Sequence, residues 1–200
     1  MIDDSTPWKE SLLRIADSLE RRTHQRRWTE RTSYLVERDV MNAAYAIRKL
    51  HEARKISDGM AGETVSARRH ALTGRPVDIW NRYEFVEHYD MQHTQAVKLE
   101  LTEFCNQVIH SWVFMLSATE TRPHRFDGVY VSSDRARKKH VDFIAADALI
   151  KAFRDVGLDN IVSLEWQRDP NGDVQITKAS RAADAVPTTG GADDDERITP

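Results

Sequence analysis

The hydrophobic residues between 97 and 112 recur mostly at intervals of three and four, and this is the most regular pattern in the chain. At about 100° per residue, the spacing places them on one face of an α-helix and places Glu103, Asn106 and His110 opposite. The pattern predicts a helix over residues 97–112 that buries its apolar face and exposes a polar row with one imidazole. The apolar residues are Val97, Leu101, Phe104, Cys105, Val108, Ile109 and Trp112.

Helical spacing also predicts three helices before residue 97. The first begins near Thr6, the second spans about residues 28–57, and the third follows Pro76 over residues 77–90. Residues 59–75 contain three glycines and few apolar side chains, so we expect a loop there, with at most one helical turn around residues 65–71. In the third helix we expect the large apolar side chains to face the core: Ile79, Trp80, Tyr83, Phe85 and Val86.

From residue 112 onward, short apolar runs and alternating patterns are typical of strands. We predict strands over 112–116, 126–132, 139–144 and 161–167, a helix over 147–156, and a return strand from Val174 after the turn Asp169-Pro170-Asn171-Gly172. Helices followed by strands predict an α+β fold. We expect a bundle of about four helices at residues 1–111, a small antiparallel sheet with one helix at 112–179 that shares its core, and a disordered acidic tail at 180–200.

The composition is that of an ordinary soluble protein and narrows the function only by exclusion. A formal net charge of −3 argues against a chain that binds nucleic acid over its whole surface, so any such contact must be local. The single cysteine, Cys105, lies on the predicted buried face, which suits a reducing compartment. The sequence shows neither a secretory leader nor an apolar run long enough to span a membrane, so we expect a cytoplasmic protein without a membrane partner.

Potential metal ligands do not form a recognised pattern in the sequence. Glu84 and His88 share a helix face, but the spacings of di-iron and zinc-protease sites are absent. A Gly-rich phosphate loop and a Gly-x-Ser-x-Gly elbow are absent as well. We therefore expect no metal and no cofactor.

Glu103, Asn106 and His110 form the first candidate site, because residues three and four apart are neighbours on a helix surface. The segment Phe104-Cys105-Asn106-Gln107-Val108-Ile109-His110 resembles the motif helix of HEPN domains. The resemblance implies a four-helix bundle and a metal-independent endoribonuclease of a toxin or defence system, with His110 as acid and base and Asn106 as positioning group. The family's motif also carries an arginine before these residues, and none of Glu103, Phe104 and Cys105 supplies it.

RNA cleavage needs a fixed positive charge on the phosphate in addition to an acid–base group. We expect that charge to come from elsewhere in the chain, from Arg68, Arg69, Arg122 or Arg125, although no sequence rule places any of them near His110. Two alternatives stay open. In the first, Asn106 and His110 have a structural role and cap the helix end or bond the following strand. In the second, the polar row forms the dimer surface of an inactive bundle.

Two basic segments between predicted strands form the second candidate site, for contacts with nucleic acid. One contains Arg122 and Arg125, and the other contains Arg135, Arg137, Lys138 and Lys139. If both loops lie at the same end of the sheet, they form a joint surface for phosphate groups. The alternative is that these charges protect strand edges from pairing with other chains.

Since no catalytic set is complete, we hypothesise a non-enzymatic cytoplasmic interaction protein. Its partner would be another protein, a second copy of itself or RNA, bound through the basic loops and the polar face of the central helix. The alternative hypothesis is a HEPN-like metal-independent endoribonuclease, which the resemblance around His110 implies.

Overall fold

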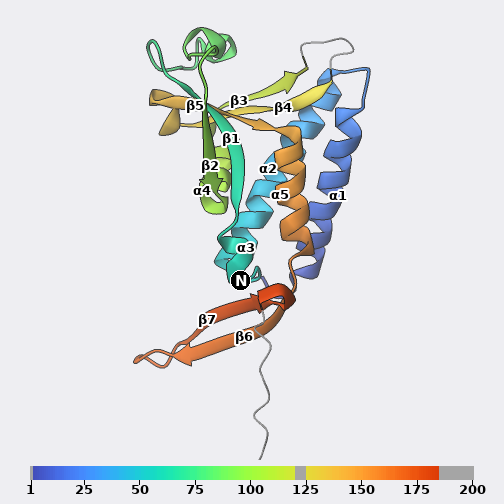
Figure 1. Cartoon of the computed structure of the whole chain (residues 1–200), viewed down its shortest axis with the longest axis vertical. Helices are drawn as coiled ribbons and strands as arrows, with labels where there is room; N and C mark the ends of the chain where they lie inside the picture. The colour runs from blue at the N-terminus through green and yellow to red at the C-terminus, as the bar shows by residue number, and fades with distance from the viewer. Residues whose placement is uncertain (1, 120–124, 185–200) are drawn as a thin grey trace, which may run out of the picture.

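Two long helices begin the chain, and strands and shorter helices follow them (Figure 1). The computed structural model describes residues 2–119 and 125–184. The helices are α1 (Thr6–Thr23), α2 (Glu30–Glu52), α3 (Asp58–Ala61), α4 (Leu101–Ile109) and α5 (Ala146–Leu158), with three 3-10 helices, η1 (Arg82–Glu87), η2 (Ala136–Lys138) and η3 (Ala182–Asp184). The strands are β1 (Thr64–Ala71), β2 (Gln95–Glu100), β3 (Ser111–Ala118), β4 (Phe126–Ser133), β5 (His140–Ala145), β6 (Ile161–Arg168) and β7 (Val174–Arg181).

Five of the strands form one antiparallel sheet in the order β2-β1-β5-β4-β3. One face of this sheet carries the main core, in which apolar residues of α1, α2, α4 and α5 pack on Val65, Val129 and Ile144 of the strands. Strands β1 and β2 precede residue 112 and join the same sheet as β3, β4 and β5, so the sheet spans the boundary expected at residues 111 and 112.

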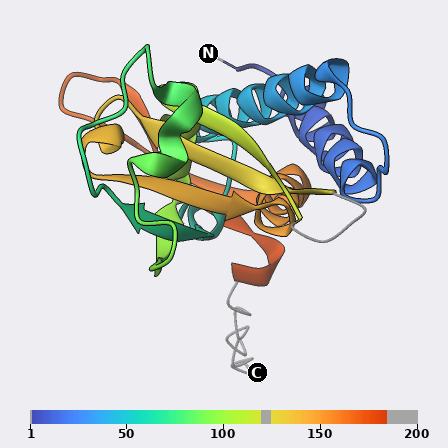
Figure 2. The ribbon, with the colours of Figure 1, turned by 90° about the horizontal axis from the view of Figure 1, so that it is seen from above.

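The opposite face of the sheet carries a smaller apolar cluster under the segment that contains η1 (Figure 2). Val77, Phe85 and Tyr89 of this segment pack with Val113 and Val141 of the sheet. Burial raises the pKa of the Tyr89 hydroxyl to about 12. The sheet is therefore covered on both faces, by helices on one side and by an irregular segment on the other.

Helix α2 is the element that later matters for the site, and its sequence explains its position. The Thr29 hydroxyl accepts a hydrogen bond from the Thr32 N–H (3.2 Å) and so caps the first turn. Val40, Ala43 and Ile47 are buried against the core. Arg48 follows Ile47 directly and is therefore turned to the margin of the buried stripe, where its side chain is 37% exposed.

Strands β6 and β7 form a separate hairpin that extends away from the sheet (Figure 1). Its turn is the one predicted from Asp169 to Gly172, and Gly172 adopts a positive φ of 90° that favours glycine. The hairpin is joined to the body where the Ala179 N–H donates to Asp58 Oδ2 (2.9 Å). Most of its side chains, including Trp166, are exposed.

The α+β class is confirmed, as are the first two helices, the helix over 147–156 and the strands predicted after residue 112. Residues 1–111 contain the helices α1, α2, α3 and α4, and they also contribute β1 and β2 to the sheet, two strands that were not predicted there. The expected disordered tail at 180–200 begins too early, because β7 continues to Arg181 and η3 ends at Asp184. Residues 185–200 lie outside the described residues.

The loop expected at residues 59–75 is wrong because its central part, Thr64–Ala71, forms strand β1. Val65 and Ala67 are buried and alternate with the exposed Ser66, which is the period of a strand. The backbone of β1 pairs with β2 on one side and β5 on the other. Those partners lie some tens of residues away in the chain, so the local pattern alone did not show them.

The helix expected over 77–90 is also wrong, and only η1 remains of it. Asp78 and Asn81 explain the difference, because their side chains bond nearby backbone N–H groups. Asp78 Oδ1 accepts from Trp80 N–H (2.8 Å) and Asn81 N–H (3.2 Å), and Asn81 Oδ1 accepts from Asp78 N–H (2.7 Å). Such bonds compete with helix formation. Of the apolar residues expected inside, Phe85 is buried, whereas Ile79, Trp80, Tyr83 and Val86 are exposed.

The helix expected over 97–112 is shorter than predicted and is flanked by strands at both ends. Val97 lies in β2, opposite Ala67 of β1, and Trp112 lies in β3. Only Leu101–Ile109 are helical, as α4. The helical spacing between Val97 and Leu101 was coincidental, because Val97 and Leu99 follow the two-residue period of the β1–β2 ladder.

Within the described residues, no helix is long and apolar enough to cross a membrane.

Candidate functional site

Helix α4 presents Asn106 and His110 at the end of the helix that leads into β3. Its other face anchors it, because Phe104, Cys105 and Val108 are fully buried. Burial raises the pKa of the Cys105 thiol to about 12, so this cysteine is not a reactive nucleophile. The His110 N–H donates to the Asn106 carbonyl oxygen (3.1 Å), which ends the helix and leaves the imidazole exposed.

Arg48 of α2 lies against both of these residues. Its Nη1 donates to Asn106 Oδ1 (2.8 Å) and lies 3.5 Å from His110 Nε2. Because a guanidinium has only donors, His110 Nε2 faces it as an acceptor in this geometry. A cation, a carboxamide and an imidazole are therefore brought together from two helices.

Glu52, one turn further along α2, holds the Arg48 side chain in place. Arg48 Nε donates to Glu52 Oε1 (2.9 Å), and Lys49 Nζ donates to Glu52 Oε2 (2.8 Å). The Lys49 and Arg48 bonds together lower the pKa of Glu52 to about 2. Glu52 is thus ionised throughout the neutral range and shares its charge between two cations, which leaves the pair of helices locally positive.

An open hollow of about 400 Å³ lies beside this group and includes one of the predicted basic loops. Its lining residues are Arg48, Asn106, His110, Ser133, Asp134 and Arg135. Two bonds hold the loop to the end of α4: the Asp134 N–H donates to the His110 carbonyl (3.2 Å), and the Ser133 N–H donates to Gln107 Oε1 (2.9 Å). Arg135 of the second predicted loop site therefore lies beside Asn106 and His110 of the predicted helix site.

The charges around the hollow favour an anion. Arg135 is exposed and forms no ion pair with any residue that the structure describes. Asp134 is the one acidic residue of the lining, and its Oδ1 accepts from Arg137 Nε (2.9 Å), which offsets its charge. Two guanidinium groups and an imidazole remain to face a ligand such as a phosphate, with Asn106 and Ser133 as neutral polar neighbours.

Glu103, the third residue of the predicted polar row, faces a different arginine. Arg69 Nη2 of β1 lies 3.8 Å from Glu103 Oε1, and Glu103 does not line the hollow. Arg69 itself forms a bidentate pair with the fully buried Asp142, at 2.8 Å and 2.9 Å. Arg69 was one of the cations expected to serve a phosphate at His110, and this pairing commits it elsewhere. Arg68, also expected, stacks on Phe143 instead.

The two basic loops lie at opposite ends of strand β4, so they do not form the joint phosphate surface that was expected if both lay at the same end of the sheet. Strand β4 separates them, because Arg125 precedes it and Arg135 follows it. Eight residues at about 3.3 Å each put the loops about 25 Å apart. Arg122 lies outside the described residues.

The other residues of the second basic loop have different environments. Arg137 packs over the Trp112 ring at 4.5 Å and donates to the Val77 carbonyl, so it is largely structural. Lys138 and Lys139 are exposed at η2 and do not line the hollow beside His110. Only Arg135 of this loop reaches the site.

The sequence pointed to His110 and Asn106 but not to Arg48. Fifty-eight residues separate Arg48 from Asn106 along the chain. The only local signal at Arg48 is its four-residue spacing from Glu52, which is common on exposed helix faces. The contact becomes visible only when α2 and α4 are packed.

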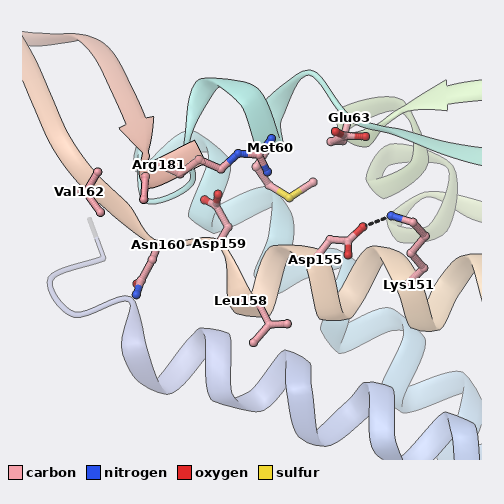
Figure 3. Close-up of a pocket in the computed structure, with 10 residues that line it drawn as sticks. Met60, Glu63, Lys151, Asp155, Leu158, Asp159, Asn160, Val162 and Arg181 are labelled. Carbon is pink, nitrogen blue, oxygen red and sulfur yellow. Dashed lines mark hydrogen bonds and ion pairs between the residues drawn. The ribbon is translucent and has the colours of Figure 1, made fainter. Parts of the chain in front are cut away.

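Another hollow, of about 570 Å³, lies away from this site where the hairpin meets α5, and it is less suited to a ligand (Figure 3). Lys151 and Asp155 at its rim bond each other, as the dashed line in Figure 3 marks. Asp159 accepts two hydrogen bonds from Ser57, at 2.7 Å each. These charged groups already have partners, within α5 for Lys151 and Asp155 and at Ser57 for Asp159.

Among the residues that the structure describes, no group of three or more His, Cys, Asp or Glu side chains is arranged to hold a metal ion. Comparison of the chain with protein-family models, with curated proteins and with solved structures finds no match.

Proposed function

We propose that this protein binds RNA, and that the hollow formed by Arg48, Asn106, His110 and Arg135 receives a phosphate group of the RNA. The observation that carries this proposal is the position of Arg48, whose Nη1 lies 2.8 Å from Asn106 Oδ1 and 3.5 Å from His110 Nε2. Arg135 adds a second guanidinium from an independent element. Guanidinium groups match the geometry of phosphate oxygens and are weakly hydrated, so they suit such contacts.

The overall charge makes the site local and its affinity dependent on salt. With a net charge of −3, the body of the protein repels RNA weakly, and attraction is confined to the basic hollow. Each phosphate contact on a single strand contributes about −0.7 to the slope of log K against log salt concentration. We therefore expect moderate binding at low salt that weakens steeply as salt is added.

The test compares wild type with Arg48→Met in titrations of a fluorescent RNA at several salt concentrations. Methionine keeps a long, helix-compatible side chain and removes the charge. We expect binding to weaken by roughly 10-fold or more, as for the loss of a charge-assisted hydrogen bond, and the salt slope to fall by about 0.7.

Arg14→Met is the matched control. Arg14 pairs with Glu10 at the same four-residue spacing on α1, and its side chain is 68% exposed. It does not line the hollow, so this variant should bind RNA as wild type does. Unchanged binding by Arg48→Met, or no RNA binding by wild type at low salt, would contradict the proposal.

A second candidate function, metal-independent RNA cleavage, is favoured by the same arginine. The motif helix that this segment resembles carries an arginine, and here Arg48 of α2 brings a guanidinium to the imidazole instead. Once the Arg48 guanidinium binds the phosphate, His110 Nε2 would be free to take the proton of a ribose 2′-hydroxyl. The 2′-oxygen would bond to phosphorus while the bond from phosphorus to the 5′-oxygen breaks, and His110 would return its proton to that 5′-oxygen, leaving a 2′,3′-cyclic phosphate. Arg48 would stabilise the charge that develops on the phosphate. The resemblance does not extend to the fold, because α4 lies between two strands of a sheet and not in a four-helix bundle.

The experiment for this second candidate is RNA incubation in EDTA with wild type, His110→Ala and Arg48→Met. Cleavage by wild type alone would support it. Equal cleavage by wild type and His110→Ala, or no cleavage by wild type that binds RNA, would leave RNA binding as the function.

We further propose a cytoplasmic location, because the free Cys105 is buried and suits a reducing compartment. A protein partner or a second copy of the chain stays a prediction.

A further inference from the structure

A second hollow, of about 460 Å³, lies next to the first one on the same side of α2. Ser111 lines it, and the preceding residue His110 lines the first hollow, so both hollows reach the junction of α4 and β3. Unlike the first hollow, it has aromatic side chains in its walls, together with aliphatic, charged and polar ones. The walls are formed by Ser33, Glu37 and Met41 of α2, by Arg82 and Tyr83 of η1, and by residues of β3 including Ser111, Trp112 and Phe114.

Helix α2 forms a continuous wall for both hollows. Met41 lines the aromatic hollow and Arg48 lines the cationic one. Seven residues are close to two helical turns, so these side chains lie on the same face, about 10 Å apart along the helix axis. A single extended ligand can therefore contact both hollows.

Two aromatic rings in the second hollow are accessible to a ligand. The Tyr83 side chain is 71% exposed and Trp112 is 37% exposed. An arginine lies over each ring: Arg82 is 4.9 Å from the Tyr83 centroid and Arg137 is 4.5 Å from the Trp112 centroid. Such pairs fix the orientation of the rings and place positive charge beside them.

Arg137 also connects the two hollows physically. It packs on Trp112 in the second hollow and donates to Asp134, which lines the first. Arg137 also donates to the Val77 carbonyl, so it and the loop that carries Arg135 stay in place without the Trp112 ring. The aromatic and cationic groups are thus held in one arrangement.

The exposure of aromatic residues around η1 is itself unusual. Their pattern predicted burial, yet Trp80 is 89% exposed, and Ile79 and Tyr83 are exposed with it. Of these residues Tyr83 lines the aromatic hollow, and an exposed aromatic side chain at a hollow favours an interaction surface. Aromatic rings next to cations fit unpaired nucleobases, which offer a flat face for stacking whatever their sequence.

We propose that Trp112 and Tyr83 stack the unpaired bases of a single-stranded RNA whose phosphate lies in the hollow of Arg48 and Arg135. This inference rests on the proposed RNA binding and names the kind of RNA. Paired bases are stacked within a duplex and do not reach such rings. Asn106 and Ser133 lie beside the cations as hydrogen-bonding groups for a ribose 2′-hydroxyl, which favours RNA over DNA. Glu37 in the aromatic hollow disfavours a phosphate there and can accept from a base amino group.

The experiment measures the binding of four fluorescent probes to the full chain by anisotropy. The probes are a ten-nucleotide oligocytidine, a ribose-phosphate oligomer of the same length without bases, an RNA duplex, and the DNA counterpart of the oligocytidine. We expect wild type to prefer the oligocytidine over the other three. We expect Trp112→Leu to weaken oligocytidine binding by at least about 5-fold, the effect of losing one stacked base, and to leave binding of the base-free oligomer unchanged.

Tyr83→Ser is a second variant, chosen because this exposed side chain is not part of either buried cluster. It should weaken oligocytidine binding in the same selective way. Trp166→Leu is the matched control, because Trp166 is 72% exposed on the distant hairpin and should not affect any probe. The salt slope should be unchanged in all three variants, since none of them removes a charge.

The outcomes separate the two proposals. Equal binding of the oligocytidine and the base-free oligomer, or wild-type binding by both Trp112→Leu and Tyr83→Ser while Arg48→Met is weak, would overturn stacking and keep phosphate binding. Equal binding of DNA and RNA would overturn the choice of RNA. If wild type binds none of the probes, the proposed function itself fails.

Discussion

Two arginines contact helix α4, and their environments differ sharply. Arg69 reaches Glu103 from β1 and forms two hydrogen bonds with Asp142, which is fully buried. Arg48 reaches Asn106 and His110 from α2 and pairs with Glu52, whose side chain is 43% exposed. Arg69 and the buried Asp142 form what we call the enclosed pair, whereas Arg48 lies at an open hollow.

The difference indicates which of the two is available to a ligand. The hydrogen bonds that Arg69 donates to Asp142 raise the pKa of Arg69, and removing that guanidinium would leave a buried carboxylate without its main partner. Arg48 has partners that water also reaches, so exchanging part of these contacts for a phosphate costs little. A structural role for Arg69 and a binding role for Arg48 follow from the burial of the carboxylates that they meet.

The largest expected effect comes from breaking the enclosed pair. Asp142→Ala should lower the free energy of unfolding by about 3 kcal/mol, the lower end of the range for a broken buried ion pair. The lower end applies because the Arg69 side chain is 25% exposed and can turn partly toward water. Urea unfolding at neutral pH measures the change.

Glu103→Gln provides the comparison on the same arginine. Glu103 lies 3.8 Å from Arg69 and is 48% exposed, so its loss should change stability far less than the loss of Asp142. Equal losses in the two variants would show that the burial of Asp142 does not set the strength of the pair.

A smaller effect is expected from pH at the enclosed site. Burial lowers the pKa of His140, whose Nε2 lies 3.6 Å from Asp142 Oδ2. The folded state therefore keeps this imidazole neutral, whereas the unfolded chain binds a proton near its ordinary pKa of about 6.5. The contribution of neutral His140 to the free energy of unfolding is therefore complete above about pH 6.5. It is lost as the pH falls from this value toward the lower pKa of His140 in the folded state.

His140→Gln should flatten the dependence of stability on pH between about 7 and 5. Urea unfolding at both pH values measures it. His24→Gln is the control, because the His24 side chain is exposed and makes no hydrogen bond or ion pair with any residue that the structure describes, so this variant should keep the pH dependence of wild-type stability. If His140→Gln kept the full pH dependence of wild-type stability, a residue other than His140 would be responsible for that dependence.

The smallest effect concerns the open site. Glu52→Gln removes the carboxylate that Arg48 shares with Lys49, so both cations become freer to attract a phosphate. We expect RNA binding to tighten by roughly 2- to 3-fold at low salt, with no increase at high salt where such surface charges are screened. Weaker binding instead would show that Glu52 mainly orients Arg48 for the ligand.

Parts of the fold that depend on neighbouring residues could be predicted, and parts that depend on distant partners could not. Helix α5 and the hairpin turn at Asp169 were predictable, because the apolar spacing and the turn residues lie within the segment itself. Strand β1 was missed because its pairing partners are β2 and β5. The helix around η1 was predicted wrongly because Asp78 and Asn81 bond the local backbone, which spacing does not report.

The candidate site divides in the same way. His110 and Asn106 were found because their four-residue spacing puts them together on any helix. Arg135 was found as a basic loop residue without a position relative to His110. Arg48 was not found, because its side chain meets Asn106 only through the packing of α2 on α4.

The sequence by itself determined the α+β class, the amphipathic faces of the long helices and the polar end of α4, since each follows from residues a few positions apart. The tertiary structure alone decided that Arg48 and Arg135 meet His110, that Arg69 is committed to Asp142, and that Tyr83 remains exposed. The physical reason is the distance along the chain over which each interaction acts. Periodicity and capping act within a turn or two of chain, whereas ion pairing and burial depend on which distant elements pack together.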